Sequence, residues 1–172
     1  VRYPPALFRQ NALFRREAAG NFATLLRAVA RDPAMLIYLD GMRSVARKPN
    51  ENFARELLEL FTLGEGHYTE DDIKNSARAF TGWMCNFKEF IYEPKRHDFG
   101  EKTFMGRSGN FDGWEILDII FEQPAMARFI TKKLWNYFGY ESPEPELVEA
   151  LAKTFRESNY ELKPVLKQMF LS

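Results

Sequence analysis

Residues 50–64 read Asn-Glu-Asn-Phe-Ala-Arg-Glu-Leu-Leu-Glu-Leu-Phe-Thr-Leu-Gly, and their pattern decides the class of fold. With 100° of rotation per residue, the charged side chains of this stretch fall on one side of a helix. Relative to Glu51 they are Arg55 at about 40°, Glu59 at about 80° and Glu56 at about 140°. The apolar side chains fill an arc of roughly 180–340°. An arc of that width predicts a mostly buried helix, whose charges must be paired or functional.

The composition of the whole chain is that of a globular domain with a sizeable core. Of its 172 residues, 45% are hydrophobic, and 16 are phenylalanine. Lysine plus arginine and aspartate plus glutamate both number 24, and no basic run occurs, so we expect no nucleic-acid partner. The one cysteine excludes an internal disulfide and a cysteine-based zinc site. No segment approaches the roughly 18–20 apolar residues of a membrane-spanning helix.

Helical periodicity and capping residues predict a mainly helical bundle. We expect capping boxes to begin two of the helices, at Thr69 and at Asp112. The helical period is lost at about residues 84–110, where we expect a short irregular or β-hairpin insertion. The expected helices cover residues 4–18, 22–30, 34–39, 50–62, 70–81, 112–122, 124–138, 147–155 and 162–171.

We find no internal repeat or domain boundary, so residues 1–172 are expected to form a single all-α domain. The chain opens at Val1 without a methionine, and it closes at Leu171-Ser172, directly after an apolar helical pattern. We therefore expect the domain to be the C-terminal part of a longer protein.

The charged side of the helix over residues 50–62 is the first candidate site. Glu51 and Arg55 form an i,i+4 pair in the favourable order, and we expect Glu59 to approach Arg55 from the other side. One interpretation is a salt-bridge ladder that braces neighbouring helices. In the other, Glu56 and Glu59 bind a metal or act as a general base, and Arg55 orients an anionic group. The Glu-x-x-His motif of di-metal bundles is absent from the sequence.

His97, Asp98 and Lys102 form the second candidate site, in the non-helical segment. One interpretation is a hydrogen-bonded turn in which Asp98 caps local amides, with Lys102 at the surface. The other pairs His97 with the carboxylates of the charged helix in a hydrolytic or metal-binding site, where Lys102 contacts a phosphate, sulfate or carboxylate. The residues identify no cofactor, and a divalent metal is an alternative that we do not favour. Its candidate ligands are Glu56, Glu59, His97 and Asp98.

Several spaced motifs resemble a large bacterial family catalogued as domain of unknown function 1800. The resemblance covers nearly the whole chain. The stretches that carry it are residues 32–40, 50–64, 68–72, 77–83, 97–106 and 133–135.

The resemblance implies a location more than an activity. The family has no established reaction, and its members are commonly longer and often exported, which implies a periplasmic or extracellular home. This chain lacks the family's N-terminal portion, which we expect to pack on this domain. The matching polar positions are Asn50, Glu51, Arg55, Glu56, Glu59, Asp72, Arg78, His97, Asp98 and Lys102.

Two functions from different classes follow from these patterns. The first, which we favour, is a noncatalytic cell-envelope or extracellular scaffold that binds a protein or glycan partner. It requires Arg55 to form ion pairs with both Glu51 and Glu59, and it requires His97 to point away from the charged helix. The second is a hydrolase-like or metal-dependent enzyme, which requires His97 to approach a carboxylate of the charged helix within one pocket. Its polar centre would combine Glu51, Arg55, Glu56, Glu59, His97, Asp98 and Lys102.

Overall fold

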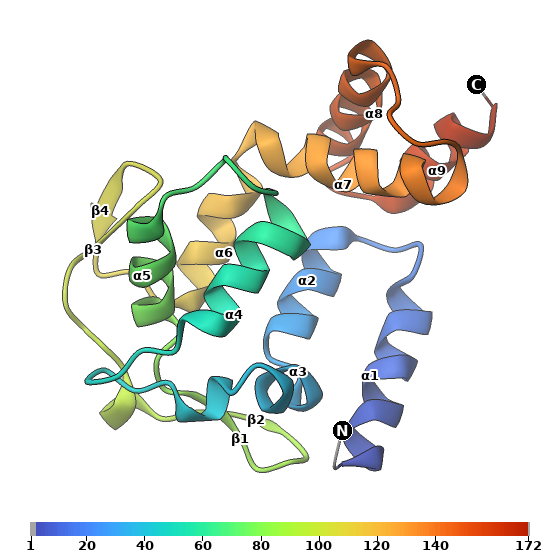
Figure 1. The fold of residues 1–172 in the computed structure, drawn as a ribbon. Helices are drawn as coiled ribbons and strands as arrows, with labels where there is room; N and C mark the ends of the chain where they lie inside the picture. The colour runs from blue at the N-terminus through green and yellow to red at the C-terminus, as the bar shows by residue number, and fades with distance from the viewer. Residues whose placement is uncertain (1–2, 172) are drawn as a thin grey trace.

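Helices dominate the computed structural model, which describes residues 3–171 (Figure 1). The prediction of a mainly helical fold is confirmed. The helices are α1 (Pro4–Glu17), α2 (Phe22–Ala30), α3 (Pro33–Tyr38), the 3₁₀ turn η1 (Gly41–Arg43), α4 (Glu51–Glu56), the π-helix η2 (Leu57–Thr62), α5 (Glu70–Ala79), the 3₁₀ turn η3 (Pro94–Arg96), α6 (Gly113–Phe121), α7 (Pro124–Phe138), α8 (Pro145–Glu157) and α9 (Leu162–Leu171). The expected helices begin and end within about two residues of their predicted positions, with α4 and η2 together covering the helix expected over residues 50–62. The short 3₁₀ turns η1 and η3 fall in segments that we expected to be non-helical.

The expected capping residues begin several of these helices. Asn50 accepts a hydrogen bond from the backbone of Asn52 at the start of α4. Thr69 and Asp112 each form a capping box, with Asp72 and Glu115 respectively. Each box satisfies backbone N–H groups that have no partner within the helix, so the local sequence fixes where α5 and α6 start.

The non-helical insertion contains two short antiparallel hairpins. Strand β1 (Trp83–Cys85) pairs with β2 (Phe90–Tyr92), and β3 (Lys102–Phe104) pairs with β4 (Arg107–Gly109). The second hairpin turns through Met105 and Gly106, which both have positive φ, as a two-residue hairpin turn requires. The predicted hairpin insertion is confirmed. The second hairpin was not expected, because it depends on the Met105-Gly106 turn, and hydrophobic periodicity does not reveal a turn.

Helix α4 continues directly into the π-helix η2, which the sequence pattern does not predict. Thr62 Oγ1 donates to the Leu57 carbonyl at 2.6 Å, and the Leu63 amide donates to the Leu58 carbonyl at 2.9 Å, both five residues back. A π-helix has more residues per turn than an α-helix, so each residue rotates by less than 100°. This rotation moves Leu60 out of the predicted buried arc, and the side chain is 45% exposed.

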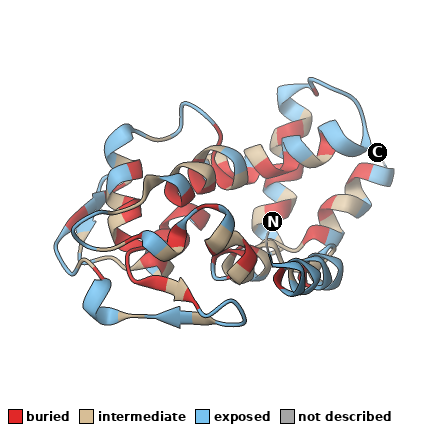
Figure 2. Cartoon of the chain, turned by 60° about the horizontal axis from the view of Figure 1, so that its bottom comes forward, coloured by how far each residue is buried: buried red, intermediate tan, exposed pale blue. Residues whose placement is uncertain are grey.

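The hydrophobic core includes buried residues of α4 and η2 and extends to α9. The buried residues are red in Figure 2. Leu57 and Leu58 are fully buried. Helix α4 packs on α5, and η2 packs on α7, which in turn packs on α8. In Figure 1, α7, α8 and α9 form one group beside the centre that α4, α5 and α6 build. The apolar arc of residues 53–61 therefore joins two parts of the helical body.

Gly64 ends the long helix in the left-handed region, as predicted, with φ of 79°. A Cβ at this position would lie 2.6 Å from the Phe129 ring, whereas one at Gly66, where φ is 82°, would meet nothing within 4 Å.

We expect Gly64→Ala to lower the free energy of unfolding by about 2–4 kcal/mol, from left-handed strain and from the clash with Phe129. Gly66→Ala provides the matched control, because it introduces the left-handed backbone strain without a clash. We expect it to lower the free energy of unfolding by about 1 kcal/mol. Urea denaturation measures both values. Equal losses would contradict the close approach of Gly64 to Phe129.

Candidate functional site

Arg55 binds two carboxylates, but one of them differs from the prediction. Its guanidinium donates to both carboxylate oxygens of Glu70 at 2.9 Å and to Glu51 at 3.4 Å. Among the described residues no ion pair joins Arg55 to Glu59, so the expected bracketing by Glu59 is wrong. Helix α5 packs on α4 and brings Glu70 to Arg55, a long-range contact that helical spacing cannot reveal. The hydrogen bonds to Glu70 raise the pKa of Arg55, and the same bonds lower that of Glu70.

The two remaining acids of the charged helix lie apart from this pair. Glu59 accepts a hydrogen bond from the Tyr68 hydroxyl at 3.2 Å. Burial, followed by the negative charge of Glu59, raises the pKa of Tyr68. Glu56 is partly buried, and the structure gives it no hydrogen bond or ion pair within residues 3–171.

His97 is buried and bonded to the turn that follows helix α5. Its Nδ1 lies 2.9 Å from the Thr81 carbonyl oxygen. Since a carbonyl can only accept, Nδ1 carries the proton, and in the neutral ring Nε2 holds the lone pair. The ring packs edge-on against Tyr92 and Phe99. Within the described residues no hydrogen bond reaches Nε2.

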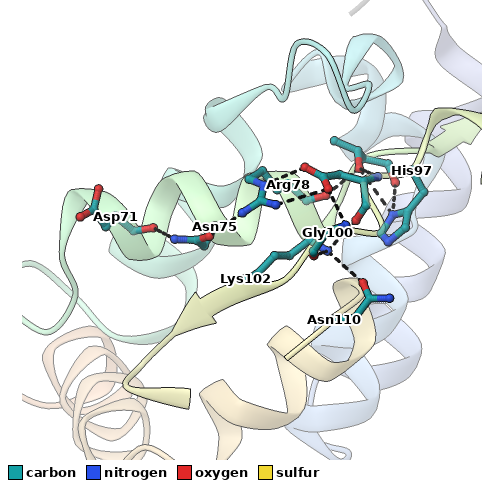
Figure 3. A network of polar contacts seen from close by, with 9 residues as sticks. Asp71, Asn75, Arg78, His97, Gly100, Lys102 and Asn110 are labelled. Atoms are coloured by element: carbon teal, nitrogen blue, oxygen red, sulfur yellow. Dashed lines mark hydrogen bonds and ion pairs between the residues drawn. The ribbon is translucent and has the colours of Figure 1, made fainter. Parts of the chain in front are cut away.

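Asp98 joins the loop after His97 to helix α5 through a two-point ion pair with Arg78, which is labelled in Figure 3. Its carboxylate accepts from Arg78 Nε at 2.7 Å and from Nη2 at 3.3 Å. It also accepts from the Gly100 amide, so the local turn that we considered for Asp98 is present. The Arg78 guanidinium holds the pKa of Asp98 below its usual value, since a bonded cation favours the charged carboxylate.

Lys102 is 1% exposed, so the expectation of a surface lysine is wrong. Its ammonium donates to the carbonyl oxygens of Asp98 at 2.5 Å and Gly100 at 3.0 Å, with the Asn110 amide oxygen at 3.4 Å (Figure 3). Burial lowers the pKa of Lys102, and the nearby carboxylate of Asp98 opposes that shift. Lys102 therefore closes the loop over residues 98–100 from the inside.

The structure brings together His97, Asp98 and Lys102, and among the described residues no hydrogen bond or ion pair joins them to the charged side of α4 and η2. Roughly 12 Å of helix axis separates Glu70 from Arg78, because each residue of α5 rises by about 1.5 Å. The described residues contain no group of three or more His, Cys, Asp or Glu side chains that could hold a metal ion. The proposed metal ligands Glu56, Glu59, His97 and Asp98 thus do not converge. The catalytic role of these residues stays a prediction.

An apolar groove is the feature that sequence reasoning missed. It has a volume of about 390 Å³ and lies between α1, α2, η2 and α7. Lys133 is the one charged residue among the described side chains that line it. The periodicity of each helix predicts its buried side, but only the tertiary arrangement shows where neighbouring helices leave a gap. The lining residues are Phe14, Ala18, Phe22, Leu25, Leu26, Val29, Met35, Leu60, Phe61, Ile130, Lys133, Leu134 and Leu162.

A larger and more polar hollow, of about 670 Å³, lies between the 64–67 loop, α7 and α8. Its walls mix both signs of charge, with Glu65, His67 and Lys132 beside an ion pair of Arg128 with Glu149 at 2.6 Å. No single ligand chemistry follows from that mixture.

The fold and these contacts define a class of protein: a mainly helical domain with two short hairpins, in which ion pairs hold both ends of one helix. The family model described as protein of unknown function DUF1800 matches residues 2–172, so the chain belongs to that family, as the motifs indicated. No curated protein and no solved structure matches it. Within residues 3–171 every helix is too short or too polar to cross a bilayer.

Asp98→Asn should lower the free energy of unfolding at pH 7 by about 2–3 kcal/mol, because it leaves the partly buried Arg78 without its charge partner. A lowered carboxyl pKa in the folded state adds stability above the unfolded-state value of 3.8, and that stability is lost as the pH falls through the folded-state pKa. The difference between wild type and variant should therefore shrink below pH 3.8.

The control for this variant is Glu122→Gln. Glu122 also pairs with an arginine, Arg107, but both side chains are at least half exposed. We expect little change in stability from it. Urea titrations at pH 7 and pH 3 measure both variants, and an Asp98→Asn effect as small as that of the control would contradict a structural role for the Arg78 pair.

Proposed function

We propose that this domain is a noncatalytic binding module of the cell envelope or extracellular space, and that it holds a protein partner in the apolar groove. The observation that carries the proposal is the groove itself. Phe14 is 40% exposed and Leu60 is 45% exposed, and both line it. Contiguous exposed apolar surface of this kind is typical of interaction sites, because a partner that covers it removes the surface from water.

The contacts of the candidate catalytic groups also support a noncatalytic function. Arg55, Asp98 and Lys102 each bind groups of the same chain. A catalytic acid, base or anion-binding group must reach the substrate, so side chains held in internal contacts are better suited to bracing the fold. The exported location follows the resemblance to the family and extends the same proposal.

One observation favours the alternative of a hydrolase-like enzyme. His97 presents an Nε2 without a protein partner, beside Phe99, which is 60% exposed. A neutral imidazole with a lone pair could act as a general base. The carboxylates of the charged helix, however, lie elsewhere, so His97 lacks the partner that the enzyme hypothesis requires.

We expect no catalytic turnover that depends on His97. The informative variant is His97→Asn, whose amide can retain the hydrogen bond to the Thr81 carbonyl while removing Nε2. The full-length protein and this variant should release product at equal rates from a panel of ester, phosphoester, glycoside and peptide substrates. A substrate that wild type converts at least tenfold faster than a His97→Asn variant of equal melting temperature would overturn the proposal.

The binding role is tested in a strain that lacks the chromosomal gene. Leu60→Glu should fail to restore the wild-type phenotype of the deletion strain, because it places a charge in the groove. Ile91→Glu is the matched control: Ile91 is 41% exposed on β2 and lies outside the groove. Ile91→Glu should restore the wild-type phenotype, and so should His97→Asn. Restoration by Leu60→Glu would contradict the proposed function.

A further inference from the structure

We infer that the chain carries a saccharide-binding site in a polar cleft between the start of α2, the end of α6 and the turn after α8. The cleft lies between residues 21–27, 118–121 and 159–160 and has a volume of about 370 Å³. We call it the α2–α6 cleft. Its described lining residues include none of those that line the apolar groove, so the inference goes beyond the proposed function.

Contacts within the chain hold the three segments of the cleft in place. Helix α2 packs on α6, and the Tyr160 hydroxyl donates a hydrogen bond to the Phe121 carbonyl. The Asn21 carboxamide donates to the Asn159 carbonyl at 2.7 Å, and the Phe22 amide donates to the Tyr160 carbonyl at 2.8 Å. The cleft is therefore formed before a ligand arrives, which reduces the entropy that is lost on binding.

The charges of the cleft favour a neutral ligand. Arg27 and Asp118 are the two charged residues among the described lining side chains, and they form an ion pair with each other. Arg27 also lies over the Phe121 ring, 5.3 Å from its centroid. An anion would have to compete with Asp118 for Arg27, and a cation with Arg27 for Asp118. The cleft therefore offers no net charge to either kind of ion.

The free polar groups of the cleft include both donors and acceptors. The Thr24 hydroxyl and the Asn159 carboxamide line it, and neither side chain has a hydrogen-bond partner within the described residues. The Arg27 guanidinium has N–H groups beyond the one that bonds to Asp118, and the carboxylate has further lone pairs. A sugar presents several hydroxyl groups that each donate and accept, so it matches this mixture.

The volume and the apolar part of the cleft also suit a small saccharide. Small-molecule pockets have volumes of roughly 300–1,000 Å³, so a volume of about 370 Å³ suits a mono- or disaccharide. Ala23 and the rings of Phe121 and Tyr160, whose centroids lie 5.3 Å apart, supply apolar contacts for the C–H groups of a sugar ring. A divalent cation is a less suitable occupant, because Asp118 is the one carboxylate among the described lining residues.

Titration of the full-length protein with a panel of neutral sugars tests the inference. The panel contains glucose, galactose, mannose, N-acetylglucosamine and their disaccharides, and saturation-transfer-difference NMR measures binding. At least one sugar should bind saturably. Its affinity should change less than twofold between 50 and 500 mM NaCl, because salt screens charges and the ligand has none. Inorganic phosphate and CaCl₂ should not displace it.

Two variants remove free polar groups of the cleft without removing a hydrogen bond within the described part of the chain. Thr24→Val replaces the hydroxyl with a methyl group of similar size. Asn159→Gly removes the carboxamide, and glycine retains the left-handed conformation of this residue, whose φ is 54°. Each variant should weaken sugar binding at least fivefold, because the sugar loses a hydrogen-bond partner.

Two further variants are the controls for the cleft. Thr103→Val makes the same chemical change as Thr24→Val, but on β3 and outside the cleft. Leu60→Glu alters the apolar groove. Both should leave the sugar affinity unchanged.

The inference is overturned if no sugar of the panel binds, or if Thr24→Val and Asn159→Gly both bind sugar as tightly as wild type. An affinity that falls with salt, or displacement of the sugar by phosphate or CaCl₂, identifies an ion as the ligand and also overturns it. Loss of sugar binding in Leu60→Glu places the sugar in the apolar groove and overturns the cleft as the site. The phenotype of Leu60→Glu in the deletion strain tests the proposed function separately.

Discussion

The apolar arc of helix α4 and the π-helix η2 has to be covered, and the packing that covers it determines where the other elements lie. Leu57 and Leu58 are fully buried at the junction between the two helical forms. Burial of a leucine contributes about 1.5–3 kcal/mol, which is more than an exposed ion pair contributes. The charged side of the same helix consequently faces α5, which packs on α4. The Arg55–Glu70 ion pair is a result of this packing rather than its cause.

Local patterns in the sequence predict most of the fold. Capping boxes at Thr69 and Asp112 and the glycine stop at Gly64 depend on neighbours within a few residues, so the chain itself specifies them. The partner of Arg55 and the burial of Lys102 depend on contacts between distant segments, and spacing carries no information on those. The second polar cluster is an example: His97, Asp98 and Lys102 lie together as neighbours in sequence, but Arg78 of helix α5 and Thr81 of the turn after it, which hold His97 and Asp98, could not be assigned to them from spacing.

The π-helix links the fold to the proposed binding site. An insertion-like widening of the helix turns Leu60 away from the buried arc, and Leu60 then lines the groove together with Phe61. Lys133, which also lines the groove, donates a hydrogen bond to the Leu60 carbonyl. A regular α-helix over residues 57–62 would place Leu60 at the edge of the buried arc, so the same sequence would present less apolar surface there.

This arrangement affects how loss-of-function variants in the polar clusters should be interpreted. Lys102 is almost completely buried and bonds to two carbonyl oxygens, so truncating it leaves acceptors without a donor and opens the 98–100 loop. A substitution of Lys102 or Asp98 removes part of the structure that holds α5. Loss of function in such a variant is therefore no evidence that these residues take part in a reaction. Phe14 and Leu60 are partly exposed, so substitutions there change the surface and leave the core packed. Function that is lost at the groove while stability is retained is the pattern that distinguishes a binding module from an enzyme.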